Sequence, residues 1–169
     1  MGYVHDVNFS VFVHPSLCGY GGGTWTNEVT ANGWLSSRTA ADASFNLLIP
    51  VRLWGNSAAY RGCKLVSADI WWEVTTAAMD EVTAYIYQSI LPINGDEFAA
   101  PTLIVFTYDA GHNDAAERIT VDQHKMTVTL TTPVLVDEDD KFYIRIVGDA
   151  ALTSIFNFYG ARLNFTFRS

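Results

Sequence analysis

The chain has 169 residues, of which 49% are apolar and 14% are aromatic. This length suits one domain and is short for two, and the apolar content excludes a disordered protein. The 18 Asp and Glu residues outnumber the 10 Lys and Arg residues, which gives a formal net charge of −8. Nucleic acids and anionic membranes also carry negative charge, so this acidity argues against both as partners.

The first 43 residues predict a strand followed by an extended segment. Apolar residues alternate with polar ones over 8–14, as in a half-buried strand. Glycines then crowd residues 15–42, which have no clear period and contain Trp25 and Trp34. Structureless loops of this length are uncommon in compact domains unless they are functional. We therefore predict a glycine-rich arm or loop in residues 1–43, whose two tryptophans bury against a neighbouring subunit or the edge of the body.

Residues 44–169 predict the body of the domain as a series of strands. Side-chain character switches with period two, which places neighbouring side chains on opposite faces of a sheet. The predicted strands cover 44–49, 64–74, 81–88, 102–108, 118–121, 125–131, 141–147 and 154–168. Turn residues separate them at jelly-roll spacing, and no segment has the pattern of a long amphipathic helix. The prediction is an all-β, antiparallel, jelly-roll-like sandwich of eight or nine strands.

The cysteines and the N-terminus indicate the cellular compartment. Cys18 and Cys63 are too few for a disulfide framework, so we expect reduced, buried thiols, with a bridge between them as the alternative. The first 37 residues contain neither Lys nor Arg, so the basic region of a signal peptide is missing. No apolar run reaches the length of a membrane-spanning helix. We expect a protein made in a cytoplasm and not sent through a membrane.

No catalytic or cofactor motif is complete. The glycine-rich residues 19–24 lack the final glycine and the following helix of a dinucleotide fingerprint. Residues 55–59 match half of a nucleophile elbow and lack its last glycine. We therefore predict no enzymatic activity and no cofactor.

Two groups of potential metal ligands have simpler interpretations. Four side chains could meet across a loop and the start of a strand: Asp109, His112, Asp114 and His124. The simpler interpretation is a solvated loop. The acidic run 137–140 could supply oxygen ligands to Ca²⁺, but Phe142 stands where an EF-hand requires glycine. We interpret it as an acidic hairpin turn and predict no bound metal.

The predicted strand 64–74 has an unusual outward face. Asp69, Trp71 and Glu73 alternate on it. Carboxylates beside an exposed tryptophan resemble a sugar platform, whereas a tryptophan covered by another strand or subunit is the interpretation we favour. Tyr85 and Tyr87 would face outward on a neighbouring strand, and so large an aromatic surface marks an interface.

Several stretches resemble a loose class of jelly-roll proteins found in phage genomes and environmental sequences. They lie from Ile49 onward and are Gly62–Ile70, Tyr108–Asn113, Ala116–Arg118, His124–Leu130 and Phe158–Leu163. The resemblance implies a structural module of a virus particle, either a head decoration (cement) protein or a fibre domain. Such proteins are commonly trimers with a jelly-roll body and an N-terminal arm.

We therefore expect a non-enzymatic virion protein, most simply a capsid decoration protein that stabilises a phage shell. The expected partners are copies of itself in a homotrimer and the major capsid protein, and the expected location is the virion, after synthesis in the host cytoplasm. The contact residues would be Trp25, Trp34, Trp71, Tyr85 and Tyr87. The alternative is a carbohydrate-binding module or a receptor-binding fibre domain, with a glycan as ligand.

Overall fold

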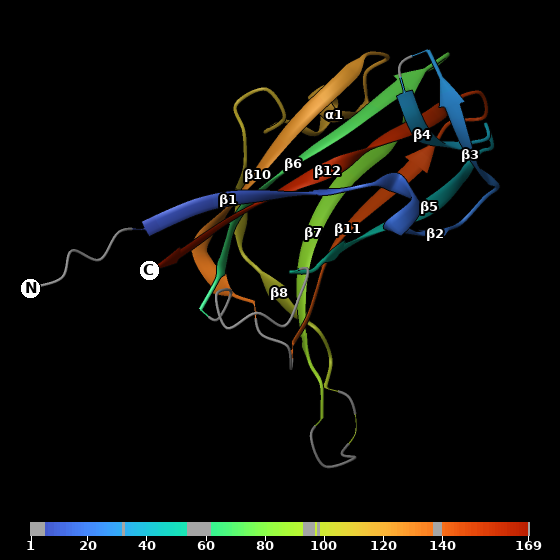
Figure 1. Cartoon of the computed structure of the whole chain (residues 1–169). Coiled ribbons are helices and arrows are strands. Elements are labelled where there is room, and N and C mark those ends of the chain that lie inside the picture. Colours follow the sequence, from blue (N-terminus) through green and yellow to red (C-terminus); the bar gives the residue numbers. More distant parts are fainter. Residues whose placement is uncertain are drawn as a thin grey trace, which may run out of the picture.

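The computed structural model describes residues 6–31, 33–53, 62–92, 97, 99–136 and 140–168 (Figure 1). Its strands are β1 (Asp6–Val13), β2 (Gly19–Gly21), β3 (Trp25–Thr30), β4 (Gly33–Arg38), β5 (Ala43–Val51), β6 (Lys64–Thr75), β7 (Glu81–Ile90), β8 (Thr102–Ile104), β9 (Phe106–Tyr108), β10 (Gln123–Leu135), β11 (Asp140–Ala150) and β12 (Ile155–Arg168). A 3₁₀ turn, η1 (Pro15–Leu17), and a short helix, α1 (Ala115–Ile119), complete the described elements.

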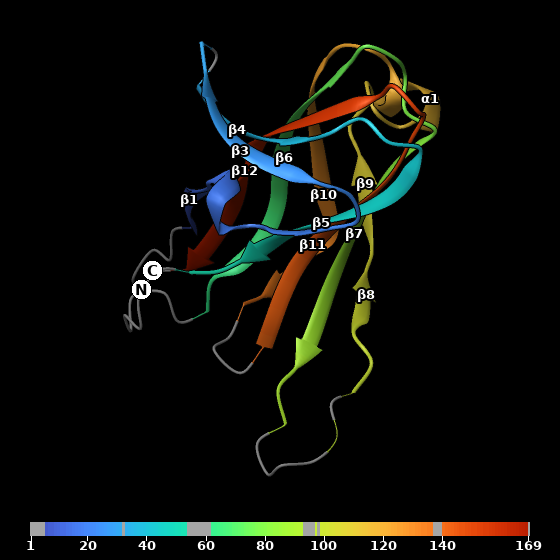
Figure 2. The same cartoon turned by 90° about the vertical axis from the view of Figure 1, so that its right-hand side faces the viewer.

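The strands form two antiparallel sheets that pack face to face. The seven-stranded sheet has the order β3-β4-β12-β6-β10-β9, and β1 also pairs with β12. The five-stranded sheet has the order β2-β5-β11-β7-β8, and β5, β11, β7 and β8 lie side by side in Figure 2. The predicted antiparallel β-sandwich is therefore confirmed, with more strands than the eight or nine expected.

Side chains that alternate along the strands of both sheets fill the core between them. From the five-stranded sheet, Leu47, Ile86 and Ile144 are fully buried, and Ile70 and Leu163 meet them from the other sheet. The period-two pattern predicted these inward faces because each second side chain points to the same side. The alternation slips by one residue at the start of β6: its register shifts between Leu65 and Ser67, so Leu65 is buried and Val66 is not.

The glycine-rich segment is not an extended arm. Residues 15–42 form η1, β2, β3 and β4, and these strands pair with β5 and β12 of the body. Gly22 and Gly23 have φ angles of +77° and +86°, where the chain passes from one sheet to the other. A Cβ at Gly22 would lie 2.5 Å from the Ser44 carbonyl oxygen, so the turn requires glycine. The glycines thus serve a tight crossover rather than flexibility.

Three other elements differ from the sequence-based prediction, each for an identifiable physical reason. Residues 118–121 were expected as a strand, but Asp114 and Glu117 form a capping box that starts α1. Residues 102–108 divide at Val105, because β8 pairs with β7 in one sheet and β9 pairs with β10 in the other. Strand β5 continues through Pro50, whose position is paired only with Tyr143 on β11.

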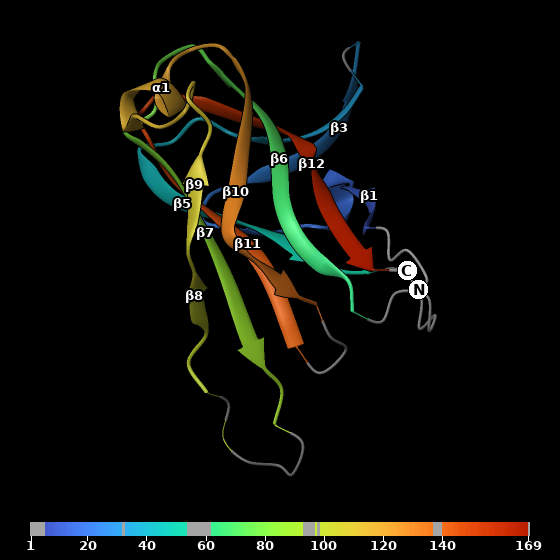
Figure 3. The ribbon, with the colours of Figure 1, turned by 90° about the vertical axis from the view of Figure 1, so that its left-hand side faces the viewer.

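The link between β6 and β7 decides which surfaces the functional candidates occupy. The two strands follow each other in the chain, yet they belong to different sheets (Figure 3). Residues 75–80 therefore arch over the end of the sandwich instead of forming a hairpin. Outward side chains of β6 and β7 consequently lie on opposite outer faces of the molecule.

Cys18 and Cys63 are not bonded to each other; Cys63 is buried and Cys18 is half-buried. Burial raises the pKa of the Cys18 thiol to about 12, and it also raises the pKa of Cys63. Within the described residues, no helix has both the length and the apolar character needed to cross a membrane.

Candidate functional site

The outer face of the seven-stranded sheet carries Trp71, which the sugar-platform alternative requires to be exposed. Its ring packs against its own chain: the guanidinium carbon of Arg162 lies 5.5 Å from the ring centre, and the Phe12 ring lies 6.3 Å away. The ammonium of Lys125 is 6.0 Å from the same centre. Trp71 is therefore half-buried beneath side chains of neighbouring strands.

The two carboxylates beside Trp71 are taken up by the same sheet. Asp69 is buried and accepts hydrogen bonds from the Arg162 Nε and Nη2 atoms at 2.9 and 2.6 Å, and from the Thr127 hydroxyl at 2.6 Å. Glu73 accepts from the Tyr159 hydroxyl at 2.9 Å and from the Asn157 amide at 3.2 Å. These acids hold strands together rather than presenting oxygens to a sugar.

Asp69 makes the stability of the fold depend on pH. Burial would raise its pKa, but hydrogen bonds from Thr127, Arg162 and Asn164 and the charge of Lys125 outweigh burial and hold the pKa below its ordinary value. A carboxyl with a lowered folded-state pKa contributes stability in full above its unfolded pKa of about 4. That contribution is lost as the pH falls through the lower folded-state pKa.

We expect Asp69→Asn to flatten the acid side of the stability profile. The urea midpoint of the wild-type protein should fall between about pH 5 and pH 2, and the variant should fall less steeply over the same range. Asp42→Asn, on an exposed acid, is the matched control and should keep the wild-type slope. Parallel slopes for wild type and Asp69→Asn would contradict this role of Asp69.

The four side chains weighed above as potential metal ligands come together only in part. His112 Nδ1 lies 2.9 Å from the Asp109 carboxylate, and His112 Nε2 lies 3.4 Å from His124 Nδ1. Asp114 instead caps α1. His124 stacks on the buried Trp72 ring at 4.8 Å. Within the described residues, no three His, Cys, Asp or Glu side chains are arranged to hold a metal ion. The acidic run 137–139 lies outside the described residues, as does the side chain of Asp140.

Tyrosines form a tiled surface on the outer face of the five-stranded sheet. The ring centres of Tyr87 and Tyr143 are 5.3 Å apart, and those of Tyr85 and Tyr87 are 6.1 Å apart, each pair nearly parallel. All three side chains are half-buried, because the alternate positions on β7 and β11 point into the core. Tyr85 and Tyr87 were expected beside Trp71, but they lie on the opposite side of the sandwich.

The sheet register extends this surface into a row. Tyr143 lies opposite Tyr87 on one side and Pro50 on the other, and Tyr87 lies opposite Leu103. A row that crosses four adjacent strands spans about 14 Å. The next row contains Tyr85, Arg145 and Leu48.

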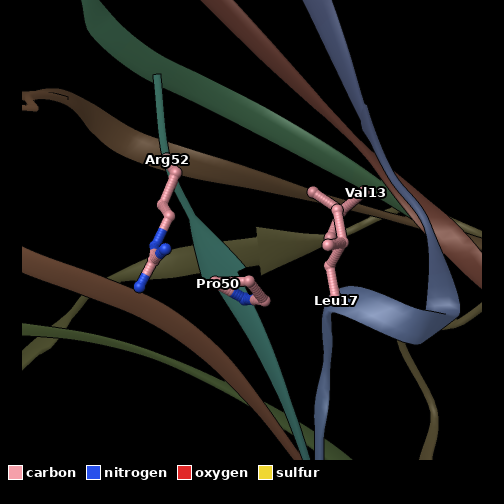
Figure 4. Close-up of a pocket in the computed structure, with 4 residues that line it drawn as sticks. All are labelled: Val13, Leu17, Pro50 and Arg52. Atoms are coloured by element: carbon pink, nitrogen blue, oxygen red, sulfur yellow. The ribbon is translucent and has the colours of Figure 1, made fainter. Parts of the chain in front are cut away.

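A shallow groove of about 550 Å³ lies where β5 and β11 meet the N-terminal turn. Leu17, Leu48, Pro50 and Tyr143 give it an apolar wall. A smaller pocket of about 120 Å³ shares Leu17, Pro50 and Arg52 with the groove and is also lined by Val13 (Figure 4). The groove and the tyrosine row are continuous, since Tyr143 belongs to both. We call them together the tyrosine face.

The two tryptophans predicted as arm anchors have different environments. Trp25 packs against Tyr20 at 4.6 Å and Phe45 at 5.4 Å between ring centres, so it belongs to the fold of its own chain. Trp34 is 42% exposed on the β3–β4 hairpin, opposite the exposed Val29.

Sequence reasoning missed Tyr143, Arg145 and the contribution of β5 to the tyrosine face. The alternation over 141–147 already indicated that Tyr143 and Arg145 point outward. The missing information was strand order: β11 lies between β5 and β7, although both partners are distant from it in sequence.

No protein-family model matches the chain, and no curated protein sequence matches it. Solved structures are similar to it at low identity. The Agl-KA catalytic domain has a TM-score of 0.44 and 10% identity, and covers 91% of this chain, which spans 27% of that protein. The family 11 carbohydrate-binding module of a Clostridium thermocellum cellulosomal cellulase has a TM-score of 0.40 and 9% identity, over 96% of this chain and 88% of the other.

A third similar structure is a conserved carbohydrate esterase of the Shiga toxin-encoding bacteriophage phi24B. Its TM-score is 0.37 at 16% identity, over 90% of each chain. Carbohydrate-binding modules recur among the similar structures. The three TM-scores lie below 0.5, so we base the function proposed below on this chain's own side chains.

Proposed function

We propose that this chain is a non-catalytic carbohydrate-binding β-sandwich whose saccharide lies across the tyrosine face. The observation that carries this proposal is the stacked row of Tyr87 and Tyr143 beside an apolar groove. A pyranose ring presents C–H groups on its faces, which pack on aromatic rings, while its hydroxyls pair with polar groups at the rim. This moves the carbohydrate alternative away from Trp71.

Polar groups suited to sugar hydroxyls stand next to the rings. Arg145 lies between Tyr85 and Leu48 in the register, and its Nε atom donates to the Asn46 side chain at 2.7 Å. This bond fixes the guanidinium at the rim of the row. An apolar surface with a few oriented polar groups is the usual composition of a ligand site.

Binding without catalysis fits the chemistry of the groove. Its described lining contains no Asp or Glu, and so brings no pair of carboxyl groups, the usual acid and base of glycoside hydrolysis, to a bound sugar. The acids of the alternative sugar platform, Asp69 and Glu73, lie on the opposite sheet and are hydrogen-bonded there.

A second proposal retains the virion decoration protein, with its homotrimer and its contact to a major capsid protein. The observation in its favour is the β3–β4 hairpin, which exposes Val29 and Trp34 as a cross-strand pair at 73% and 42%. Such an apolar pair suits a contact between subunits.

Two measurements separate these proposals. We expect the purified protein to bind members of an oligosaccharide array, and to give the mass of a monomer by light scattering across a dilution series. No binding to any oligosaccharide on the array, together with a stable trimer, would contradict sugar binding and favour the virion proposal.

A further inference from the structure

The charges of the groove identify the class of saccharide, and this inference rests on the proposed function. Three cationic side chains line the groove: Arg52, Lys141 and Arg145. Its described lining contains no Asp or Glu. The whole chain has 18 acidic and only 10 basic residues, so a cationic groove runs against the average charge of the molecule.

The opposite face shows how this chain neutralises cations elsewhere. There, Arg162 and Lys125 both lie within salt-bridge distance of Asp69, at 2.6 and 3.9 Å. By contrast, none of the three groove cations forms a salt bridge within the described part of the chain. Among the described residues, no carboxylate therefore occupies these cations in place of a ligand.

The placement of Arg145 determines where a ligand's charge would sit. Its bond to Asn46 uses the Nε atom, and its two Nη groups make no hydrogen bond to another described residue. Tyr85 and Leu48 lie on either side of it in the register, next to the row of Tyr87 and Tyr143. A ring stacked on the row thus has a guanidinium beside it.

We infer that the tyrosine face binds acidic saccharides, in which a uronic acid stacks on the row with its carboxylate at Arg145, and a further carboxylate of the saccharide pairs with Arg52 and Lys141. A guanidinium donates two parallel hydrogen bonds to a carboxylate, which makes such pairs stronger than bonds between neutral groups. The cationic groove should therefore bind acidic saccharides more tightly than neutral ones, because neutral ligands gain nothing from the charge.

The test compares one oligosaccharide with and without its charge. Tetragalacturonate, a guluronate oligomer and a glucuronate-substituted xylan fragment are titrated against the protein by calorimetry, each beside its methyl-esterified or carboxyl-reduced form. We expect at least tenfold tighter binding of one or more acidic forms, weakened as NaCl rises from about 50 to 500 mM.

Variants of the groove cations then test which side chains bind the carboxylates of the saccharide. Arg145→Gln, and the pair Arg52→Gln with Lys141→Gln, should each lower affinity for the acidic oligomer about tenfold and leave the neutral form unaffected. Lys125→Gln removes a cation from the opposite face and should change nothing. Equal melting temperatures confirm that the groove variants fold, because their side chains point outward.

The outcomes separate the inference from the proposed function. Equal affinity for charged and neutral forms would overturn the inference while sugar binding stands, and would show that the three cations are neutralised, for example by the acidic run that precedes Lys141 in the sequence. Binding to neutral oligosaccharides only would overturn it as well. Failure of every acidic and neutral saccharide would overturn both.

Discussion

Replacing Arg38 with methionine should lower the free energy of unfolding by about 3–5 kcal/mol, the largest stability effect we expect from a polar side chain here. Arg38 ends β4 and is fully buried. Its guanidinium donates to the carbonyls of Ala43, Ala41 and Gly22 at 2.9, 3.3 and 3.4 Å. Methionine of similar length would remove all of these donors from the crossover, and the Gly22 carbonyl would keep only its bond from the Trp25 indole at 3.2 Å.

The position of Arg38 explains why its loss should destabilise more than its own strand. It ties the crossover at Gly22 to the segment that enters β5, and it lies 5.0 Å from the centre of the buried Phe45 ring. A Cβ at Gly23 would stand 3.0 Å from its Nε atom, so the crossover is built around the guanidinium. Losing these bonds should loosen β2 and β3 together.

Urea unfolding monitored by tryptophan fluorescence measures this effect. Arg52→Met, on an exposed arginine, is the control and should stay within about 0.5 kcal/mol of the wild type. Arg38→Lys keeps a charge but has fewer donors, so an intermediate loss is expected. A small loss for Arg38→Met, equal to that of the control, would show that the crossover does not depend on the guanidinium.

Replacing Tyr87 and Tyr143 together with alanine should reduce saccharide affinity about 100-fold. Covering an aromatic ring with a ligand is worth about 1.5 kcal/mol or more, and each 1.4 kcal/mol is a factor of ten. The two rings stack 5.3 Å apart at the centre of the row, so their loss removes the platform itself. Both side chains face outward, and the fold should survive.

The opposite sheet offers a matched control for this experiment. Trp71→Ala also removes a half-buried aromatic ring from an outer face, but the ring lies beneath Arg162 and beside Phe12. We expect it to leave affinity unchanged. The double Phe variant at 87 and 143 should keep most of the binding, because stacking persists without the hydroxyls. Loss of binding in Trp71→Ala, with binding intact in the double alanine variant, would place the sugar on the seven-stranded sheet instead.

Local sequence patterns predicted a strand well where buried and outward side chains alternate regularly along it. The alternation over 141–147 and 154–168 matches the buried and outward positions of β11 and β12. It failed over 15–42, because glycines that signal flexibility are also the residues required by a tight crossover with positive φ. It failed over 118–121, where a capping box outweighed a short apolar stretch.

The candidate site was predicted only in its parts. Tyr85 and Tyr87 were correctly expected to face outward, and Asp69 and Trp71 do share a face. Grouping the tyrosines with Trp71 was wrong, because residues 75–80 carry the chain from one sheet to the other. A hairpin and an arch between two strands have similar turn residues, so local chemistry does not distinguish them.

The sequence by itself determined that this protein is an antiparallel sandwich and identified most of the side chains that point into its core, since alternation is a local property of each strand. Only the tertiary structure decided which strands are neighbours. Pairing of β11 with both β5 and β7 joins residues about a hundred and about sixty positions apart, and it creates the tyrosine face. Strand order depends on how two sheets bury their apolar faces against each other, which is a property of the whole chain.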